Sequence, residues 1–193
     1  MFRQSVFIVA LVLAGCASVP DPGTQTSQPA TPPVGIDGVA CVGQVPTAVA
    51  GLLPVTDAVL VAKAQMKTGA GGVCTAQAFK ADAPVKVYRV FDGSKSWTAM
   101  GGWWALTKPQ GPRDAYRELN AICPSWSALD QLVACEVKPG SSIVLGTTQS
   151  VDCPDGKTYP KTAEIQVYMA NNSQANQLYV ENCQQLGAWP SAQ

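Results

Sequence analysis

Residues 84–104 read PVKVYRVFDGSKSWTAMGGWW, and this stretch decides the architecture that the sequence predicts. Valines and aromatic residues dominate 84–91, and the turn pair Asp92-Gly93 follows, which is typical of a β-strand that ends in a tight turn. A second run of large apolar residues covers 102–106 and ends before Pro109. We therefore predict two short strands joined by a loop.

The chain on either side of this stretch predicts further short elements. Upstream, apolar residues at helical spacing predict a helix over 55–67. Downstream, we predict a helix over 111–122, with Pro112 suited to its first turn, and a second short helical stretch over 126–133. Short strands are predicted at 132–138, 142–146 and 165–169, with turns such as Pro139-Gly140 between them. Short strands mixed with a few helices predict an α+β domain.

Composition excludes several function classes. The 193 residues carry 13 basic and 13 acidic side chains and no histidine, so the formal net charge is zero. Nucleic-acid binding is disfavoured, because it requires an excess of lysine and arginine to replace counterions. Catalysis by Ser-His-Asp or Cys-His groups is impossible, as is an HExxH zinc site, and we predict no metal. Any chemistry must use carboxylates, amides, hydroxyls, an arginine or a thiol.

The first residues predict export. Residues 1–15 combine Arg3, a short apolar run and small residues, which is typical of a secretory signal peptide. Leu13-Ala14-Gly15-Cys16 resembles the lipobox of bacterial lipoproteins, in which the cysteine is acylated, with palmitate among its lipids, after cleavage just before it. The resemblance implies a membrane lipid anchor on Cys16, and Ala17 after it favours the outer membrane of the cell envelope if the source is Gram-negative. An ordinary signal peptide is the alternative.

A tether and a cross-linked domain are predicted to follow the anchor. Residues 16–38 are rich in Pro, Thr, Ser and Gln and predict a flexible tether, which leaves 39–193 as a single globular domain. Six cysteines remain in that domain, and an even number in an exported protein predicts three disulfides. Fifteen pairings are possible, and sequence proximity favours Cys41–Cys74, Cys123–Cys135 and Cys153–Cys183.

The order of four motifs between residues 84 and 169 resembles the ADP-ribosyltransferase-like fold, and more narrowly the tuberculosis necrotizing toxin type of NAD glycohydrolase. The motifs are VYRVFDG at 87–93, GGWW at 101–104, PGSSIVLG at 139–146, and YP at 159–160 before IQVY at 165–168. The resemblance implies a split β core with flanking helices, to which the cysteine count adds the predicted disulfides. It also implies an NAD+ glycohydrolase, a hydrolase that uses NAD as its substrate and needs no cofactor.

The resemblance also implies a role for each of five residues. Arg89 would clamp the pyrophosphate, and Trp103 or Trp104 would form a flat wall against nicotinamide or adenine. Gln166 would hold a ribose hydroxyl or the attacking water, and Glu164, two residues earlier, would stabilise the cation on the ribose. Read as E-x-Q, the motif makes Gln166 the catalytic residue; read as E-x-x-V-Y, it makes Glu164 the catalytic residue.

Two hypotheses for function follow. The first is an exported, lipid-anchored enzyme that cleaves NAD. The second is a non-catalytic envelope lipoprotein that uses the same fold as a binding module, because Thr162, Ala163 and Glu164 replace glycines expected before the Gln strand. The first hypothesis requires Arg89 and Gln166 to meet at one cleft.

Other residues are predicted to be structural. One of Trp103 and Trp104 should face the core, because adjacent strand residues point to opposite faces. Arg113 and Arg117 share a helix face that is either solvated or in contact with phosphates, and Ser94 and Ser96 could line the cleft. Five aromatic residues are expected to pack rather than bind: Trp97, Tyr116, Trp126, Tyr159 and Trp189.

Overall fold

Residues 32–190 are described here from a computed structural model of the chain. The predicted signal peptide, the predicted lipidation site Cys16 and residues 17–31 of the predicted tether lie outside these residues. The described part begins inside the predicted tether, where Val34 pairs with Ala40 in a small hairpin. Within residues 32–190, no helix is both long enough and apolar enough to cross a membrane.

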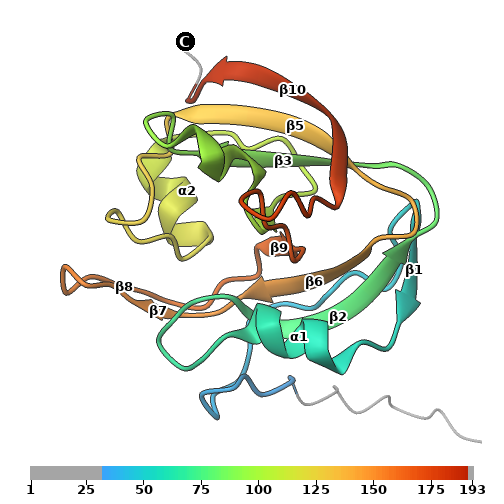
Figure 1. Cartoon of the computed structure of the whole chain (residues 1–193). Helices are drawn as coiled ribbons and strands as arrows, with labels where there is room; N and C mark the ends of the chain where they lie inside the picture. Colours follow the sequence, from blue (N-terminus) through green and yellow to red (C-terminus); the bar gives the residue numbers. More distant parts are fainter. Residues whose placement is uncertain (1–31, 191–193) are drawn as a thin grey trace, which may run out of the picture. The chain divides into compact units, whose positions relative to one another are not determined.

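The larger sheet has five strands, and all its neighbouring strands run antiparallel. Helix α1 (Ala58–Gln65) packs against β2 through Leu60 and Ala64 (Figure 1). The strand order across this sheet is β1 (Leu52–Val55), β2 (Val73–Ala81), β6 (Ser142–Thr148), β9 (Ile165–Tyr168) and β4 (Trp103–Trp104).

The smaller sheet has three antiparallel strands and lies above the five-stranded sheet in the view of Figure 1. Its order is β10 (Val180–Ala188), β5 (Gln131–Val137) and β3 (Val85–Phe91). The remaining elements are the 3₁₀ helix η1 (Ser96–Met100), helix α2 (Arg113–Leu119) and the two-stranded pair β7 (Val151–Asp152) and β8 (Thr158–Tyr159).

One residue joins the two sheets. Ala105, directly after β4, exchanges two backbone hydrogen bonds with Tyr88 of β3, at 2.8 and 2.9 Å. The two residues before it pair with β9 in the larger sheet. The chain therefore crosses from one sheet to the other at this point, and β3 and β9 come to lie on either side of it. The main core fills the space between the sheets, with Phe79, Leu145 and Val167 from one and Val87 and Val133 from the other.

Most of the predicted elements are confirmed, and the fold is α+β with a majority of strands. The predicted strands at 84–91, 132–138, 142–146 and 165–169 correspond to β3, β5, β6 and β9. Helix α1 begins later than predicted, because Asp57 caps it by accepting a hydrogen bond from the Leu60 N–H at 2.9 Å.

Three predictions of local structure were wrong or missing. The helix predicted over 126–133 does not form; a turn and an irregular segment lead directly into β5. The nine-residue strands β2 and β10 were not predicted. Strand β2 is rich in alanine, which has little preference for strands, and β10 is an edge strand whose side chains are mostly polar and exposed.

Three disulfides are present, but only one has the predicted partners. Cys41–Cys74 is confirmed, whereas the other two are Cys123–Cys153 and Cys135–Cys183. The prediction from sequence proximity was wrong because pairing follows the tertiary structure. Cys135 lies on β5, and its partner lies on the neighbouring strand β10, 48 residues away.

Candidate functional site

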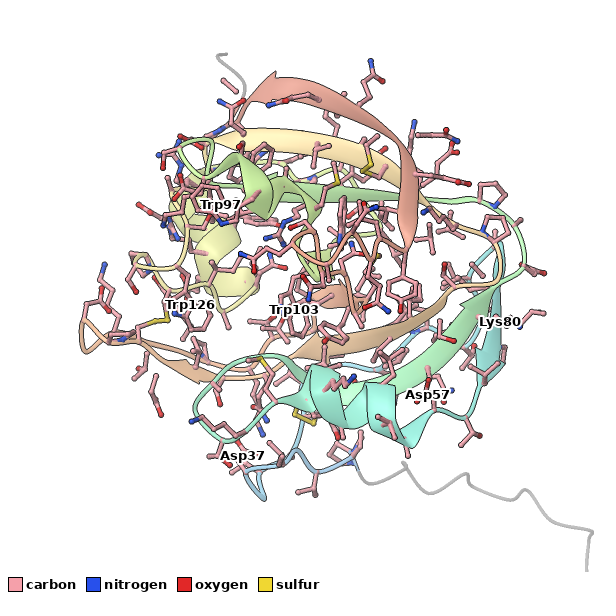
Figure 2. All side chains as sticks on the ribbon, in the orientation of Figure 1. Asp37, Asp57, Lys80, Trp97, Trp103 and Trp126 are labelled. Carbon is pink, nitrogen blue, oxygen red and sulfur yellow. A yellow bond between two sulfur atoms is a disulfide. The ribbon has the colours of Figure 1, made fainter. Side chains whose placement is uncertain are left out.

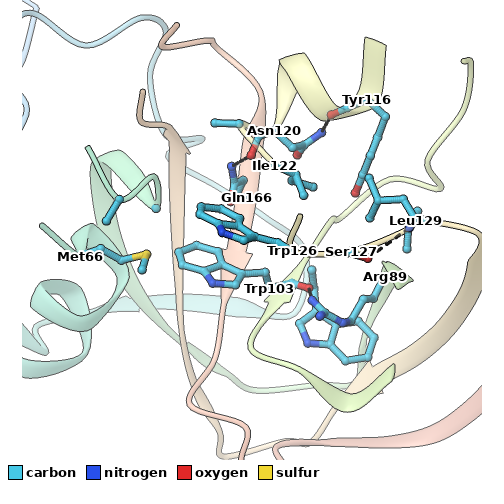
Figure 3. A pocket seen from close by; sticks show the side chains of 15 residues that line it. Met66, Arg89, Trp103, Tyr116, Asn120, Ile122, Trp126, Ser127, Leu129 and Gln166 are labelled. Carbon is cyan, nitrogen blue, oxygen red and sulfur yellow. Dashed lines mark hydrogen bonds between the residues drawn. The ribbon is translucent and has the colours of Figure 1, made fainter. Parts of the chain in front are cut away.

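A cavity of about 300 Å³ lies where β3, β4 and β9 face helix α2 and the loop that follows it (Figure 3). Four of the five predicted binding and catalytic residues line it: Arg89, Trp103, Trp104 and Gln166. Arg89 and Gln166 are far apart in the sequence and belong to different sheets, so the junction at Ala105 is what brings them together.

Arg89 is held in the cavity wall by two backbone carbonyls. Its Nε donates to the Thr98 oxygen at 2.7 Å, and Nη1 donates to the Trp103 oxygen at 2.6 Å. Within residues 32–190 no carboxylate lies within ion-pair distance of it. Burial of the guanidinium lowers the pKa of Arg89 to about 10, so the group remains charged at neutral pH. A Cβ at Gly101 would lie 2.5 Å from Nη2, so the guanidinium packs directly against a glycine.

Tyr116, which was predicted only to pack, adds a second donor near Arg89. Its ring packs edge-on against Trp189 at a centroid distance of 5.1 Å, which agrees with the prediction, but the residue also lines the cavity. Burial raises the pKa of Tyr116 to about 12, although the nearby Arg89 charge opposes the shift. The phenol is therefore protonated at neutral pH, and its hydroxyl has no hydrogen-bond partner among the described residues.

Gln166 presents a hydrogen-bond acceptor to the cavity. Its Nε2 donates to the Asn120 backbone oxygen at 3.0 Å and to Thr148 Oγ1 at 2.9 Å. A carbonyl oxygen only accepts, so the amide nitrogen must face Asn120, and this fixes the orientation of the amide. Thr148 is itself fixed, because its hydroxyl donates to the Glu164 oxygen at 3.2 Å. The Gln166 Oε1 has no donor among the described residues and is the free end of the amide.

Of the two adjacent tryptophans, one faces the core, as predicted. Trp104 is only 3% exposed, belongs to the core and donates its indole N–H to the Gly101 oxygen at 2.7 Å. Trp103 is half-buried and packs on Tyr168 at a centroid distance of 4.9 Å. Trp126, from the loop after α2, lines the same cavity and is 46% exposed (Figures 2 and 3). Trp126 was predicted to pack rather than bind; it is exposed and is one of three tryptophans that line this cavity, with Trp103 and Trp104 of β4.

The loop that carries Trp126 is held by side chains rather than by regular structure. Arg117 is 6% exposed and donates to the backbone oxygens of Ser127 at 2.6 Å and of Cys123 and Ala128 at 3.3 Å. Arg113 donates to the Leu129 oxygen at 2.9 Å. The prediction of a solvated helix face was therefore wrong for Arg117, which is buried, whereas Arg113 is exposed as predicted; both side chains nevertheless donate to carbonyls of the loop.

Glu164 does not line the cavity, although it directly precedes β9. Burial raises the pKa of its carboxyl, and no cation lies within ion-pair distance of it in the described part of the chain. Its charge contributes to the raised pKa of Tyr116, so the two groups interact electrostatically.

The other predicted positions fall outside the cavity. Ser94 donates to Asp92 Oδ1 at 2.6 Å, and Ser96 begins η1. Trp97 is 60% exposed, so the prediction that it packs was wrong, whereas Trp189 is buried as predicted.

Sequence reasoning missed Asn120 and the role of Tyr116 in the cavity. Their spacing of four residues on a helical pattern was the available signal, because it places both on one face.

Comparisons with known proteins identify no family and no structural relative for this chain. The chain matches no protein-family model, no curated protein and no solved structure. Among residues 32–190, no group of three or more His, Cys, Asp or Glu side chains is placed to hold a metal ion. The cavity offers donors at Arg89 and Tyr116, an acceptor at Gln166, and indole rings for a planar ligand.

Proposed function

We propose that this cavity binds NAD and hydrolyses its bond between nicotinamide and ribose, in a protein with an ADP-ribosyltransferase-like domain. The observation that carries the proposal is the meeting of Arg89, Gln166 and Trp103 at one cavity, although they come from three different strands. The disulfides are compatible with an exported protein, and we propose that it is anchored in the cell envelope, at the outer membrane, through lipid on Cys16.

The size of the cavity limits which part of NAD it holds. Cavities for small molecules range from about 300 to 1,000 Å³, and this one, at about 300 Å³, is at the lower limit. It therefore suits the nicotinamide and its ribose, with the adenosine half outside. The nicotinamide ring would lie against Trp103 or Trp126, and a phosphate oxygen would accept from Arg89 and Tyr116.

The proposed reaction needs no histidine. The bond from ribose C1 to the pyridinium nitrogen breaks, and both electrons stay on nitrogen, which releases neutral nicotinamide. Water attacks C1 and loses one proton, which gives ADP-ribose. The Oε1 of Gln166 would accept from a ribose hydroxyl or from that water. The Glu164 carboxylate, which lies outside the cavity, would act only through its charge, by favouring the positive charge that develops on the ribose.

The test is release of nicotinamide from NAD by the purified mature protein in detergent. Gln166→Ala should lower the rate by about 100-fold, the size of effect seen when one transition-state hydrogen bond is removed. Gln77→Ala is the matched control, because Gln77 also lies on a strand and donates twice, to the Val55 and Ala78 oxygens, but does not line the cavity. A wild-type rate no higher than that of Gln166→Ala would refute the proposal.

A second comparison tests the aromatic wall. Trp126→Ala should raise the KM for NAD several-fold, because a base stacked on an aromatic ring gains about 1–3 kcal/mol. Trp97→Ala removes a tryptophan of similar exposure that does not line the cavity, so it should leave the KM unchanged.

One observation favours a non-catalytic binding module instead. The N–H groups of Arg89 and Gln166 already donate hydrogen bonds to backbone carbonyls and to Thr148, so fewer N–H groups remain to bind a substrate. Binding of NAD detected by calorimetry, without any release of nicotinamide, would support this second function.

A further inference from the structure

We propose that the hairpin at residues 33–42 rests on the lipid bilayer that anchors the protein. This proposal depends on the proposed lipid at Cys16 and on no part of the proposed NAD chemistry. The hairpin lies at the lower edge of Figure 1, whereas β10 lies at the upper edge.

The hairpin is a fixed part of the folded domain. Val34 pairs with Ala40, the Gly35 N–H donates to the Val39 oxygen at 2.8 Å, and the Cys41 N–H donates to the Pro33 oxygen at 2.8 Å. The Cys41–Cys74 disulfide attaches its base to β2. A surface on this hairpin therefore has a defined orientation relative to the sheets.

Its outer surface is aliphatic. Four large aliphatic side chains within nine residues are 46–60% exposed: Val34, Ile36, Val39 and Val42. Such a cluster on a water-soluble surface marks a contact with another apolar surface, because single exposed aliphatic residues are common but clusters are not.

The hairpin keeps its only ionisable side chain away from that surface. Asp37 accepts from Lys161 Nζ at 2.8 Å, and the two side chains are only 16% and 8% exposed (Asp37 is labelled in Figure 2). The same Nζ donates to the Val39 oxygen at 2.7 Å. Because this one carboxylate is paired with Lys161, residues 33–42 add no unpaired charge to that surface. An apolar surface with no unpaired charge of its own suits the boundary between lipid headgroups and acyl chains, and it offers nothing to a charged protein partner.

The position of the hairpin in the sequence selects the bilayer as its partner. Only 16 positions, Ala17 to Pro32, separate the proposed lipidated cysteine from the hairpin. At about 3.4 Å per residue, even a fully extended chain of this length reaches only about 55 Å. A surface confined so close to the membrane needs little intrinsic affinity, because the second contact of a tethered molecule is intramolecular.

The experiment places a tryptophan at the hairpin of the lipid-anchored, processed protein. Ile36→Trp and the control Val59→Trp, on α1 where Val59 is 69% exposed, are each reconstituted in phosphatidylethanolamine–phosphatidylglycerol vesicles. The emission that each variant adds to that of the parent protein is then compared with and without brominated acyl chains. We expect the added emission of Ile36→Trp to be blue-shifted and quenched, and that of Val59→Trp to be unchanged.

Two results would overturn the proposal, and they are distinguishable. Added emission from Ile36→Trp that brominated lipid does not quench would show that the hairpin lies away from the bilayer, even if the anchor is present. A mass for the processed protein that shows no lipid on Cys16 would remove the tether itself. Neither readout depends on NAD, so neither failure bears on the proposed function.

Discussion

Two walls of the cavity, which is also lined by Met66, Ala70 and Gly72, are built in different ways. The strand wall, made by β3, β4 and β9, carries Arg89, Trp103 and Gln166 on backbones that are paired with neighbouring strands. The loop wall, made by α2 and residues 120–130, carries Tyr116 and Trp126. Its irregular part joins the smaller sheet only at its end, where the Asp130 N–H donates to the Phe91 oxygen, and is otherwise positioned by arginine side chains and a disulfide. The position of one wall therefore depends on main-chain pairing, and that of the other on a few side chains.

The largest expected effect comes from removing the disulfide in the loop wall. Cys123→Ser with Cys153→Ser opens a link across 30 residues, and the matched pair Cys135→Ser with Cys183→Ser opens one across 48. Loop-closure entropy predicts a loss of about 4 kcal/mol in the free energy of unfolding for either pair, measured by urea titration. Only the first pair should also lower the rate of nicotinamide release, because only that disulfide holds a segment that lines the cavity. Equal loss of rate in both pairs would contradict the distinction between the walls.

The next effect comes from Arg117. Replacing it with methionine leaves three carbonyls of the loop without their charged donor, in a site where Arg117 is 6% exposed. We expect the free energy of unfolding to fall by about 3 kcal/mol, since each bond to a charged group contributes up to that amount. Arg113→Met is the control: Arg113 is more exposed and donates to two carbonyls, so about 1 kcal/mol is expected. Urea titration of both variants measures these free energies of unfolding. A smaller loss of stability for Arg117→Met than for Arg113→Met would show that the loop does not depend on Arg117.

The same difference explains what could be predicted from the sequence. Alternating valines and aromatic residues identified β3, and the short apolar runs identified β4 and β9. The family resemblance, rather than this pattern, singled out Arg89, Trp103 and Gln166 on these strands. The loop wall has no such pattern. Residues 126–133 were predicted to be helical, and nothing local indicates that Arg117 binds carbonyls six to eleven residues later. Contacts of this kind depend on the tertiary structure, as do the disulfide partners of Cys123 and Cys135.

A smaller effect tests how firmly the strand wall orients Gln166. Thr148→Val removes the hydroxyl that accepts from the Gln166 amide, so the amide should lose its fixed orientation. We expect kcat for nicotinamide release to fall about tenfold, because small errors in position are costly to catalysis. Thr148→Ser should restore the rate.

Thr147→Val is the matched control for this substitution. Thr147 is the preceding residue of β6, and its hydroxyl lies 2.9 Å from that of Thr75, away from the cavity. It should lower stability by about 1 kcal/mol without changing kcat. If both valine variants lower kcat equally, the effect is one of general stability rather than of Gln166 orientation.

The smallest effects separate the two titratable groups, Glu164 beside the strand wall and Tyr116 in the loop wall. Burial raises the pKa of Glu164, so its ionised form is disfavoured in the folded protein, and Glu164→Gln should slightly raise stability at neutral pH and change nothing at acid pH. If the carboxylate supports cleavage, the rate should fall as the pH drops through that raised pKa, and Glu164→Gln should lower the rate and remove this dependence.

Tyr116 stays protonated until its pKa of about 12, so Tyr116→Phe should lower the rate about threefold, the effect of one lost hydrogen bond, without changing the pH profile below pH 10. Rate profiles of the three proteins from pH 4 to 10 measure both effects, and an acid limb that persists in Glu164→Gln would assign the titration to another group.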